Sequence, residues 1–318
     1  MITGIAGFVG SYLVEQCRTC YPRANIFGLY NRKRPQPATN AMEHVTALQA
    51  DITRAEDVRR AVTEARPDLM FHLAAQSSVA ASWSDPAQTL QVNAGGTLAL
   101  LEVARLAQPT ARIVLVGSGE QYGVVQPHEN PISEDHPLRP INPYAVSKVT
   151  QDLYGYQYFV AYGLPVVRVR AFNHFGPRQS DTFVLPNFAR QIALIEAGKA
   201  EPVVQVGNLE AKRDFLPVED VVAAYLAVAQ HGQAGEVYNV GSGKARSIAE
   251  ILDLLLTFAR VPIRVCQDAA RMRPVDIPLL EADISRIQAH TGWKPTIPFE
   301  SALKATLNYW RSVVNDIP

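Results

Sequence analysis

The chain has 318 residues, of which 47% are hydrophobic and 19% are charged, and its 30 basic and 30 acidic residues cancel. This length exceeds one ordinary domain, and the composition is typical of a globular protein. The balanced charge gives no overall field that would attract nucleic acid or an anionic membrane. We therefore expect neither as a partner, and any anionic ligand must be bound by local groups.

The sequence shows no targeting segment, membrane span or metal motif. Its start, MITGIAGFVG, lacks a charged leader followed by an apolar stretch and a cleavage site, and no apolar run is long enough to cross a bilayer. Three cysteines do not form a disulfide framework, and Cys17 and Cys20 fall on an expected helix without a second ligand pair. We expect a cytoplasmic protein without a metal site.

The N-terminal segment predicts a dinucleotide-binding turn. A short strand, Met1 to Thr3, runs into Gly4, Gly7 and Gly10, and residues 11–21 are expected to form a helix. Glycines at this spacing permit a tight turn and close approach of a diphosphate to the backbone N–H groups at a helix start. Because a central strand usually has about five or six residues, we expect added upstream apolar residues to stabilise the chain.

The second expected strand, residues 26–30, ends in the segment Asn31, Arg32, Lys33 and Arg34. A NAD site usually places an acidic residue here for the ribose hydroxyls, whereas a NADP site supplies positive charge for the 2′-phosphate. No acid and three basic residues favour NADP(H) as the cofactor. The alternative is a solvated loop whose charges have no role.

Strands and helices alternate as far as Pro177, which specifies a doubly wound parallel sheet of the Rossmann type, an α/β fold. After a third apolar segment, which precedes the candidate adenine contact Asp51, the expected elements are helices at 54–65, 86–107 and from Pro143, and strands at 69–75, 112–117 and 165–171. His72 lies in the near-continuous apolar run of the 69–75 strand, so we expect a hydrogen-bonded core histidine without a functional role.

The regular alternation of strands and helices ends after Pro177, and the expected elements become shorter. We expect a NADP-binding Rossmann domain over 1–180, with a segment near 215–242 returning to its sheet, and a smaller C-terminal substrate-binding domain over 181–318. The expected elements of the second part are helices at 183–198, 218–230, 247–259 and from Pro298, and strands at 202–206, 237–240 and 262–265.

The stretch from Leu115 to Lys148 carries the groups for one reaction centre. A strand end delivers Ser118 and Glu120, and Tyr144 and Lys148 lie four residues apart on one face of a helix. A free phenol titrates near about 10, and an adjacent ammonium lowers this pKa toward neutrality. We expect Ser118 to hold a substrate oxygen between itself and Tyr144. The alternative is a surface tyrosine and a solvated lysine.

Eight motifs follow one another across nearly the whole chain: GIAGFVG, HLAAQSSV, NAGGT, YAVSK, FNHFGP, NLEAKRDF, YNVGSG and GWKP. In this order they resemble the extended short-chain dehydrogenases of the NAD-dependent epimerase/dehydratase family that modify nucleotide sugars. The resemblance is greatest to the GDP-6-deoxy-4-keto-mannose reductases, with the GDP-mannose 4,6-dehydratases as neighbours. The first four motifs are typical of the wider family, whereas NLEAKRDF and RMRPVD point to this narrower group.

The resemblance implies three groups of site residues. The catalytic positions are Ser118, Glu120, Tyr144 and Lys148. Cofactor contacts are implied for Gly4, Gly7, Phe8, Val9, Gly10, Arg32, Asp51, Ile52, Leu73, Ala74, Ala75, Tyr144 and Lys148. Substrate contacts are implied for Ser78, Asn173, Val184, Arg190, Arg213, Arg273 and Asp276. The planar fork of arginine suits the oxygens of a diphosphate, although each arginine alone can also be a surface charge.

One departure from the dehydratase pattern favours a reductase. Dehydratases of this group typically show Thr, then Asp or Ser, then Glu, whereas this chain has Ser118, Gly119 and Glu120. The acid that helps to expel the C6 hydroxyl is thus absent, although the residue that abstracts the C5 proton remains. The 31–47 segment also lacks the arginine- and serine-rich loop associated with dehydratase tetramers.

The resemblance therefore implies reduction of the C4 ketone of GDP-4-keto-6-deoxy-mannose by NADPH, yielding GDP-rhamnose. Two alternatives stay open, a GDP-mannose 4,6-dehydratase and a non-catalytic sensor of nucleotide sugars or dinucleotides. We also expect a homodimer built on a four-helix bundle, because two helices carry more apolar residues than one sheet contact requires. These residues are Leu98, Leu100, Leu101, Val103, Val149, Leu153, Tyr156 and Phe159.

Overall fold

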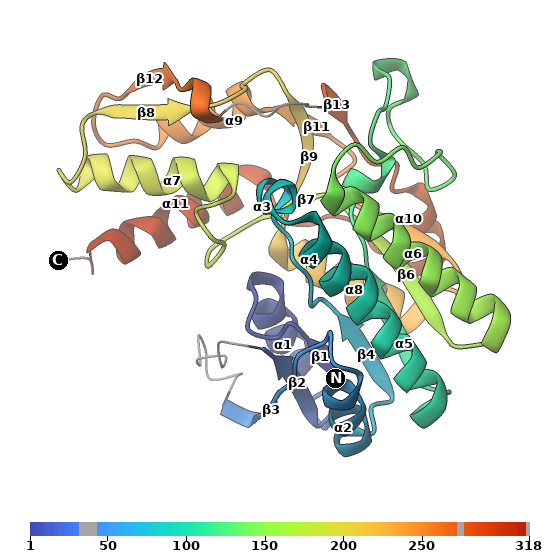
Figure 1. Cartoon of the computed structure of the whole chain (residues 1–318). Helices are drawn as coiled ribbons and strands as arrows, with labels where there is room; N and C mark the ends of the chain where they lie inside the picture. Colours follow the sequence, from blue (N-terminus) through green and yellow to red (C-terminus); the bar gives the residue numbers. More distant parts are fainter. Residues whose placement is uncertain (32–42, 272–276, 316–318) are drawn as a thin grey trace.

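The structure, a computed structural model, describes residues 1–31, 43–271 and 277–315. Within these residues the fold is built around a seven-stranded sheet whose neighbouring strands are all parallel (Figure 1). In spatial order the strands are β10 (Val237–Val240), β6 (Val166–Ala171), β5 (Arg112–Val116), β4 (Leu69–His72), β1 (Ile2–Thr3), β2 (Ile26–Tyr30) and β3 (Val45–Gln49). The chain order reverses between β1 and β4, so the predicted doubly wound sheet is confirmed.

Helices cover both faces of this sheet because successive strand residues point to opposite sides. Phe71 and Val114 pack against the first group of helices, and Met70 and Ile113 pack against the second. The first group is α1 (Phe8–Cys20), α8 (Val218–His231) and α10 (Ser285–Thr291). The second group is α2 (Ala55–Ala65), α5 (Gly96–Ala107) and α6 (Pro143–Tyr162).

One π-helical turn interrupts the helix predicted over 86–107. Its parts are α4 (Pro86–Leu90), the π turn Gln91–Gly95 and α5, and the unpredicted short helix α3 (Val79–Ser84) precedes them. Asn93 of the π turn is buried; its amide group bonds the main chain of Gln76 at 2.8 and 3.0 Å and donates to Ser147 Oγ at 2.9 Å. The π turn, which is wider than an α-helical turn, therefore links the segment after β4 to α6.

The C-terminal domain packs helices against two small sheets around a hydrophobic core of its own, which includes Leu185, Ile251 and Leu303. Its helices are α7 (Val184–Glu196), α9 (Ile248–Thr257) and α11 (Phe299–Asn315). One sheet contains β7 (Asn173–Phe175), β9 (Lys212–Pro217), β11 (Ala245–Ser247) and β13 (Leu279–Leu280), and the other contains β8 (Val203–Val206) and β12 (Arg264–Gln267). Because β7 directly follows β6 and pairs with β9, the chain passes from one sheet to the other beside the cavity described below.

Several elements differ from the sequence-based expectation. The short elements β7, β9, β11, β13 and α10 were not predicted, and β12 begins two residues later than the expected 262–265 strand. Short 3₁₀ turns lie at Gly119–Tyr122, Pro127–Glu129 and Ala269–Arg271. None of the described helices is long and apolar enough to cross a membrane.

His72 is a hydrogen-bonded core residue, as predicted. Its Nδ1 lies 2.8 Å from Thr3 Oγ1, and its Nε2 lies 3.0 Å from Thr97 Oγ1. Burial lowers the pKa of His72 to about 3, so the ring is neutral and joins β1, β4 and α5.

Candidate active site

A cavity of about 1220 Å³ runs along the carboxyl ends of the central strands and continues between the sheet and the C-terminal domain. It brings together residues from Gly4, through Ser118 and Tyr144, to Arg213. In open α/β sheets, ligands bind outside the carboxyl ends of the strands where the strand order reverses. The cavity occupies this position, beside β1 and β4.

The glycine turn at one end of the cavity has no room for side chains. Gly4 has a φ of 73°, and a Cβ there would lie 2.8 Å from the backbone N of Ala74. A Cβ at Gly10 would lie 2.7 Å from the carbonyl oxygens of Gly4 and Ile5. Gly7 caps α1 without a side-chain hydrogen bond, so the first N–H groups of the helix face the cavity as a cradle for an anion.

The other predicted cofactor residues are divided between the cavity wall and its surroundings. Phe8, Val9, Ile52, Leu73, Ala74 and Ala75 line the cavity. Asp51 is not among the lining residues; its Oδ1 accepts hydrogen bonds from the N–H and hydroxyl of Thr53 at 2.9 and 2.7 Å, and these bonds lower the pKa of Asp51. Arg32 lies outside the described residues, as do Arg273 and Asp276.

Tyr144 and Lys148 project from the first turns of α6 into the cavity. The helix starts at Pro143 because Asn142 caps it, accepting a hydrogen bond from the N–H of Ala145 at 2.8 Å. The expected lowering of the Tyr144 pKa by Lys148 is wrong, because burial raises this pKa to about 12, although a hydrogen bond with Ser118 acts against the rise. Tyr144 is therefore a phenol that can donate a proton.

Lys148 is 4% exposed, and burial lowers its pKa to about 7. Its Nζ donates to the carbonyl oxygen of Val116 and to Gln151 Oε1, both at 2.9 Å. These acceptors stabilise a charged amine at a site where burial alone disfavours it.

Ser118 and Glu120 belong to the 3₁₀ turn that follows β5. Ser118 Oγ accepts a hydrogen bond from the N–H of Glu120 at 3.2 Å, which caps the turn and holds Ser118 beside Tyr144. Glu120 Oε2 accepts from Asn142 Nδ2 at 3.2 Å. The helix cap of α6 thus also fixes the carboxylate, and the four predicted catalytic side chains line one wall of the cavity.

The predicted substrate residues are only partly brought together. Ser78, Asn173, Val184 and Arg213 line the cavity. Arg213 is 5% exposed and donates to the carbonyl oxygens of Lys212 and Ile277. Arg190 is not a lining residue and pairs with Asp181 at 3.3 Å.

His174 and Arg271 are among the lining residues that the sequence-based prediction missed. His174 stacks on Phe8, with ring centroids 6.1 Å apart, and donates from Nδ1 to the carbonyl oxygen of Phe172 at 3.1 Å. Arg271 pairs with Asp268 at 3.3 Å, and its lining position adds a cation to the substrate end. The FNHFGP motif and the RMRPVD segment contain these two residues, so the signal was available in the sequence.

Among the described residues, no group of three or more His, Cys, Asp or Glu side chains is arranged to hold a metal ion. The site groups are instead the glycine cradle, a buried Ser–Tyr–Lys set and arginines. This set suits proton donation beside a bound dinucleotide and an anionic substrate.

Comparison with known proteins finds relatives that match most of the chain. The profile of the family described as GDP-mannose 4,6 dehydratase matches residues 1–306. The GDP-6-deoxy-D-mannose reductase of Pseudomonas aeruginosa is 40% identical over 250 residues, which cover 79% of this chain and 82% of the relative. GDP-mannose 4,6 dehydratase 2 of Arabidopsis thaliana is 32% identical over 322 residues, which cover 96% of this chain and 84% of the relative.

Solved structures show the same fold over almost the whole chain. RMD from Pseudomonas aeruginosa complexed with NADPH has a TM-score of 0.84 and 34% identity, with 98% of each chain covered. The UDP-glucose 4-epimerase of Thermus thermophilus in complex with NAD has a TM-score of 0.86 and 29% identity, again with 98% of each chain covered.

Proposed function

The chain belongs to the GDP-mannose 4,6 dehydratase family, within the extended short-chain dehydrogenases, and we propose that it is an NADPH-dependent reductase of GDP-4-keto-6-deoxy-mannose that forms GDP-rhamnose. The observation that carries the choice of reductase is the packing at Gly119. Gly119 has no side chain, and a Cβ at this position would lie 3.2 Å from ring atoms of Phe172, so any side chain here would require the ring to shift by a few tenths of an ångström. The site therefore has no acid at this position to expel a C6 hydroxyl.

Tyr144, Ser118 and Lys148 have separate roles in the ketone reduction. Tyr144 donates a proton to the C4 oxygen, and Ser118 holds that oxygen beside the phenol. Lys148, as an ammonium, stabilises the phenolate that Tyr144 becomes after it has donated its proton. A dinucleotide whose diphosphate is bound at the glycine cradle would supply the hydride for C4 from its dihydronicotinamide.

The proposed division of the cavity follows the chemistry of its walls. The cofactor lies against the Rossmann domain, residues 1–180 with the returning segment near 215–242, and the GDP sugar lies toward residues 181–318. The substrate contacts are assigned to Ser78, Asn173 and Val184. The diphosphate is assigned to Arg190, Arg213 and Arg273, and the sugar of the nucleotide to Asp276. We assign the protein to the cytoplasm, where nucleotide sugars and NADPH are both available.

Turnover with defined sugars tests the proposal. Supplied with NADPH and GDP-4-keto-6-deoxy-mannose, the protein should consume one NADPH for each GDP-rhamnose formed. Supplied with GDP-mannose and NADP⁺, it should make little 4-keto product. Conversion of GDP-mannose without net NADPH loss would establish the dehydratase instead, and tight NADPH binding without turnover of either sugar would establish a sensor.

The preference for NADPH rests on the basic segment after β2, and Arg32→Asp tests it. Only NADPH carries the 2′-phosphate, so the substitution should weaken NADPH and leave NADH nearly unchanged. Loss of a charge-assisted contact is worth about 1.5–3 kcal/mol, or roughly one to two decades in Kd by fluorescence titration. Equal weakening of both cofactors would contradict the assignment.

We also propose a homodimer, and α6 supports it. Val146, Leu153, Tyr156 and Val160 are 46%, 54%, 48% and 64% exposed, and with half-buried Val149 they recur every three or four residues along one face. The expectation for α5 needs correction, because Leu100, Leu101 and Val103 are buried within their own chain.

Light scattering at micromolar concentration tests the dimer. The wild type should have the mass of two chains, and Leu153→Glu should shift it toward one chain because the glutamate would lie in the apolar interface. A monomeric wild type would overturn the proposal.

A further inference from the structure

Two buried glutamines lie directly behind the predicted catalytic side chains. Gln121 is fully buried and Gln151 is 1% exposed, and neither belongs to the cavity wall. They therefore cannot act on a ligand directly. Their contacts, however, reach the reaction centre from the protein side.

Gln121 joins the backbone of Ser118 to α6. Its Oε1 accepts a hydrogen bond from the N–H of Ser118 at 2.7 Å, and its Nε2 donates to Asp152 Oδ2 at 3.1 Å. Gly117 leaves space for the amide oxygen, since a side chain there would collide with Gln121. The position of Ser118 thus depends on where Asp152 is held.

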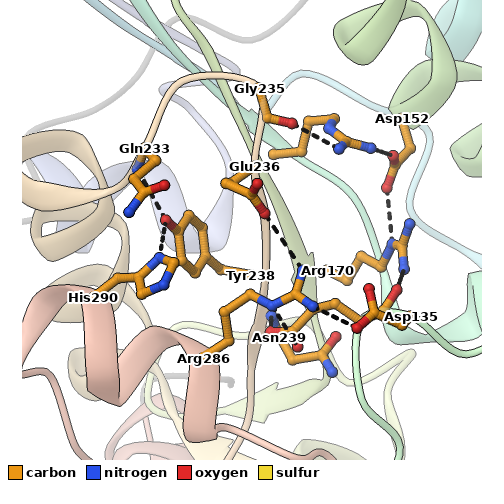
Figure 2. Close-up of polar contacts among 12 residues, drawn as sticks. Asp135, Asp152, Arg170, Gln233, Gly235, Glu236, Tyr238, Asn239, Arg286 and His290 are labelled. Carbon is orange, nitrogen blue, oxygen red and sulfur yellow. Dashed lines mark hydrogen bonds and ion pairs between the residues drawn. The ribbon is translucent and has the colours of Figure 1, made fainter.

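Asp152 is a fixed anchor. Arg168 Nη1 donates to its Oδ1 at 2.5 Å. Arg170 Nε donates to its Oδ2 at 2.9 Å (Figure 2). Arg170 also donates to the Tyr122 hydroxyl at 3.1 Å and to the Glu134 carbonyl at 2.9 Å. Burial acts to raise the pKa of Asp152, but the two guanidinium groups outweigh it and lower the pKa. A carboxylate only accepts hydrogen bonds, so it sets which end of the Gln121 amide faces Ser118.

Gln151 holds Lys148 in a similar way. Its Oε1 accepts from Lys148 Nζ at 2.9 Å, and its Nε2 donates to the Val116 carbonyl at 2.9 Å. Lys148 Nζ also donates to this carbonyl, at 2.9 Å. An ammonium has three N–H groups, so two fixed acceptors determine the direction of the third.

We propose that Gln121 and Gln151 are positioning residues that hold Ser118 and Lys148 in their working geometry from behind the cavity. This inference rests on the proposed function, which gives Ser118 and Lys148 their roles. Both amides connect a reacting side chain to the end of β5 or to the Asp152 anchor. A small displacement of a reacting group can cost about 10²-fold in rate, so the loss of either amide should be visible in kcat.

Gln121→Met tests the first half, because methionine keeps the volume and removes both hydrogen bonds. We expect kcat to fall about 10- to 100-fold, with the Kd for NADPH unchanged. The double variant Ser118→Ala/Gln121→Met should be no slower than Ser118→Ala alone, because Gln121 acts through Ser118. If the two substitutions lower kcat independently, so that their effects multiply in the double variant, the proposed role of Gln121 is wrong.

Gln151→Met and Gln151→Glu test the second half. The methionine should weaken NADPH binding and lower kcat, each by about ten-fold or more, because Lys148 loses an acceptor. The glutamate keeps an acceptor for Lys148 but loses the donor to the Val116 carbonyl, so it should retain more of both values than the methionine does. Equal losses in both variants would overturn the positioning role and leave a packing role.

The matched control is Gln230→Met, which removes a donor to the Tyr21 hydroxyl at a site remote from the cavity and should change neither value. Melting temperatures show whether each variant folds. If the wild type does not reduce the 4-keto sugar, the proposed function fails, whereas NADPH titrations of the two Gln151 variants still decide the role of Gln151. Wild-type kcat and NADPH affinity in folded Gln121→Met and Gln151→Met would overturn the whole inference.

Discussion

The two ends of the cavity are built in opposite ways. At the catalytic end, Ser118 and Lys148 are 8% and 4% exposed and are fixed by backbone atoms and buried amides. At the substrate end, the side chain of the lining residue Arg271 is 40% accessible and pairs with Asp268 at 3.3 Å. Arg190 lies outside the wall, is 35% accessible and pairs at 3.3 Å with Asp181, which lines the cavity. The catalytic end is thus fixed by buried contacts, whereas the substrate end combines the buried Arg213 with arginines in exchangeable ion pairs.

This difference predicts which kinetic constant each substitution changes. Groups held in a buried, prearranged geometry act mainly on the chemical step, because the protein does not reorganise during reaction. Exposed ion pairs contribute little to stability, so their arginines can leave an aspartate for a phosphate at small cost. Changes at the first end should therefore lower kcat, and changes at the second should raise KM.

Tyr144→Phe should have the largest effect. It removes the proton donor and keeps the buried ring, so kcat should fall by about 10²–10⁴-fold while the KM for the sugar changes little. Steady-state kinetics with NADPH and the 4-keto sugar measures both values. A variant that keeps more than about a tenth of wild-type kcat would show that another group donates the proton.

Gly10→Ala tests whether the cofactor part of the catalytic end depends on backbone contact. The new Cβ would meet the carbonyl oxygens of Gly4 and Ile5 at 2.7 Å, so the turn must open at a cost of about 1–3 kcal/mol. We expect the Kd for NADPH to rise about 10- to 100-fold in a fluorescence titration. Gly95→Ala, where a Cβ meets no atom within 4 Å, should bind NADPH like the wild type.

Arg271→Gln probes the substrate end. A charge-assisted contact is worth about 1.5–3 kcal/mol when shielded, and partial exposure reduces it, so KM for the GDP sugar should rise about ten-fold. The value of kcat should stay within about two-fold, and the difference in KM should shrink at high salt. Arg264→Gln, on exposed β12, is the control. A fall in kcat with unchanged KM would contradict the proposed difference between the two ends of the cavity.

The same contrast explains what could be predicted from the sequence. The main strands and the Tyr144 helix were predicted because apolar runs, glycine spacing and a proline at the first helical position are local patterns. Strand β9 was missed because it contains Arg213 and Asp214, which read as surface charges. Both are buried, and Asp214 accepts from the N–H groups of Ser242, Gly243 and Ala282, which are 28, 29 and 68 residues away.

The supports behind the site are also products of the tertiary fold. Ser118 and Gln121 form a capping box, which is a local pattern, but the bond from Gln121 to Asp152 and the bond from Gln151 to the Val116 carbonyl join residues 31 and 35 positions apart. The π turn at Gln91–Gly95 was predicted as ordinary helix because its apolar spacing is helical and only the contacts of Asn93 require the wider turn. Sequence patterns thus located the reacting groups, whereas the groups that hold them required the structure.

Glu120→Gln should have the smallest effect, and this makes it the sharpest test of reaction type. Glu120 lies at the catalytic end, held by Asn142 at 3.2 Å, so the comparison between the two ends alone would assign it a large effect on kcat. Ketone reduction, however, needs one proton at O4, which Tyr144 supplies, and no base at C5. The glutamine keeps an acceptor for Asn142, so the geometry of the α6 cap should survive. We expect kcat within about three-fold of wild type, because no general base contribution of about 10²–10⁴-fold is lost. Loss of activity in a folded Glu120→Gln protein, together with conversion of GDP-mannose by the wild type, would mean that Glu120 removes the C5 proton and that the enzyme is a dehydratase.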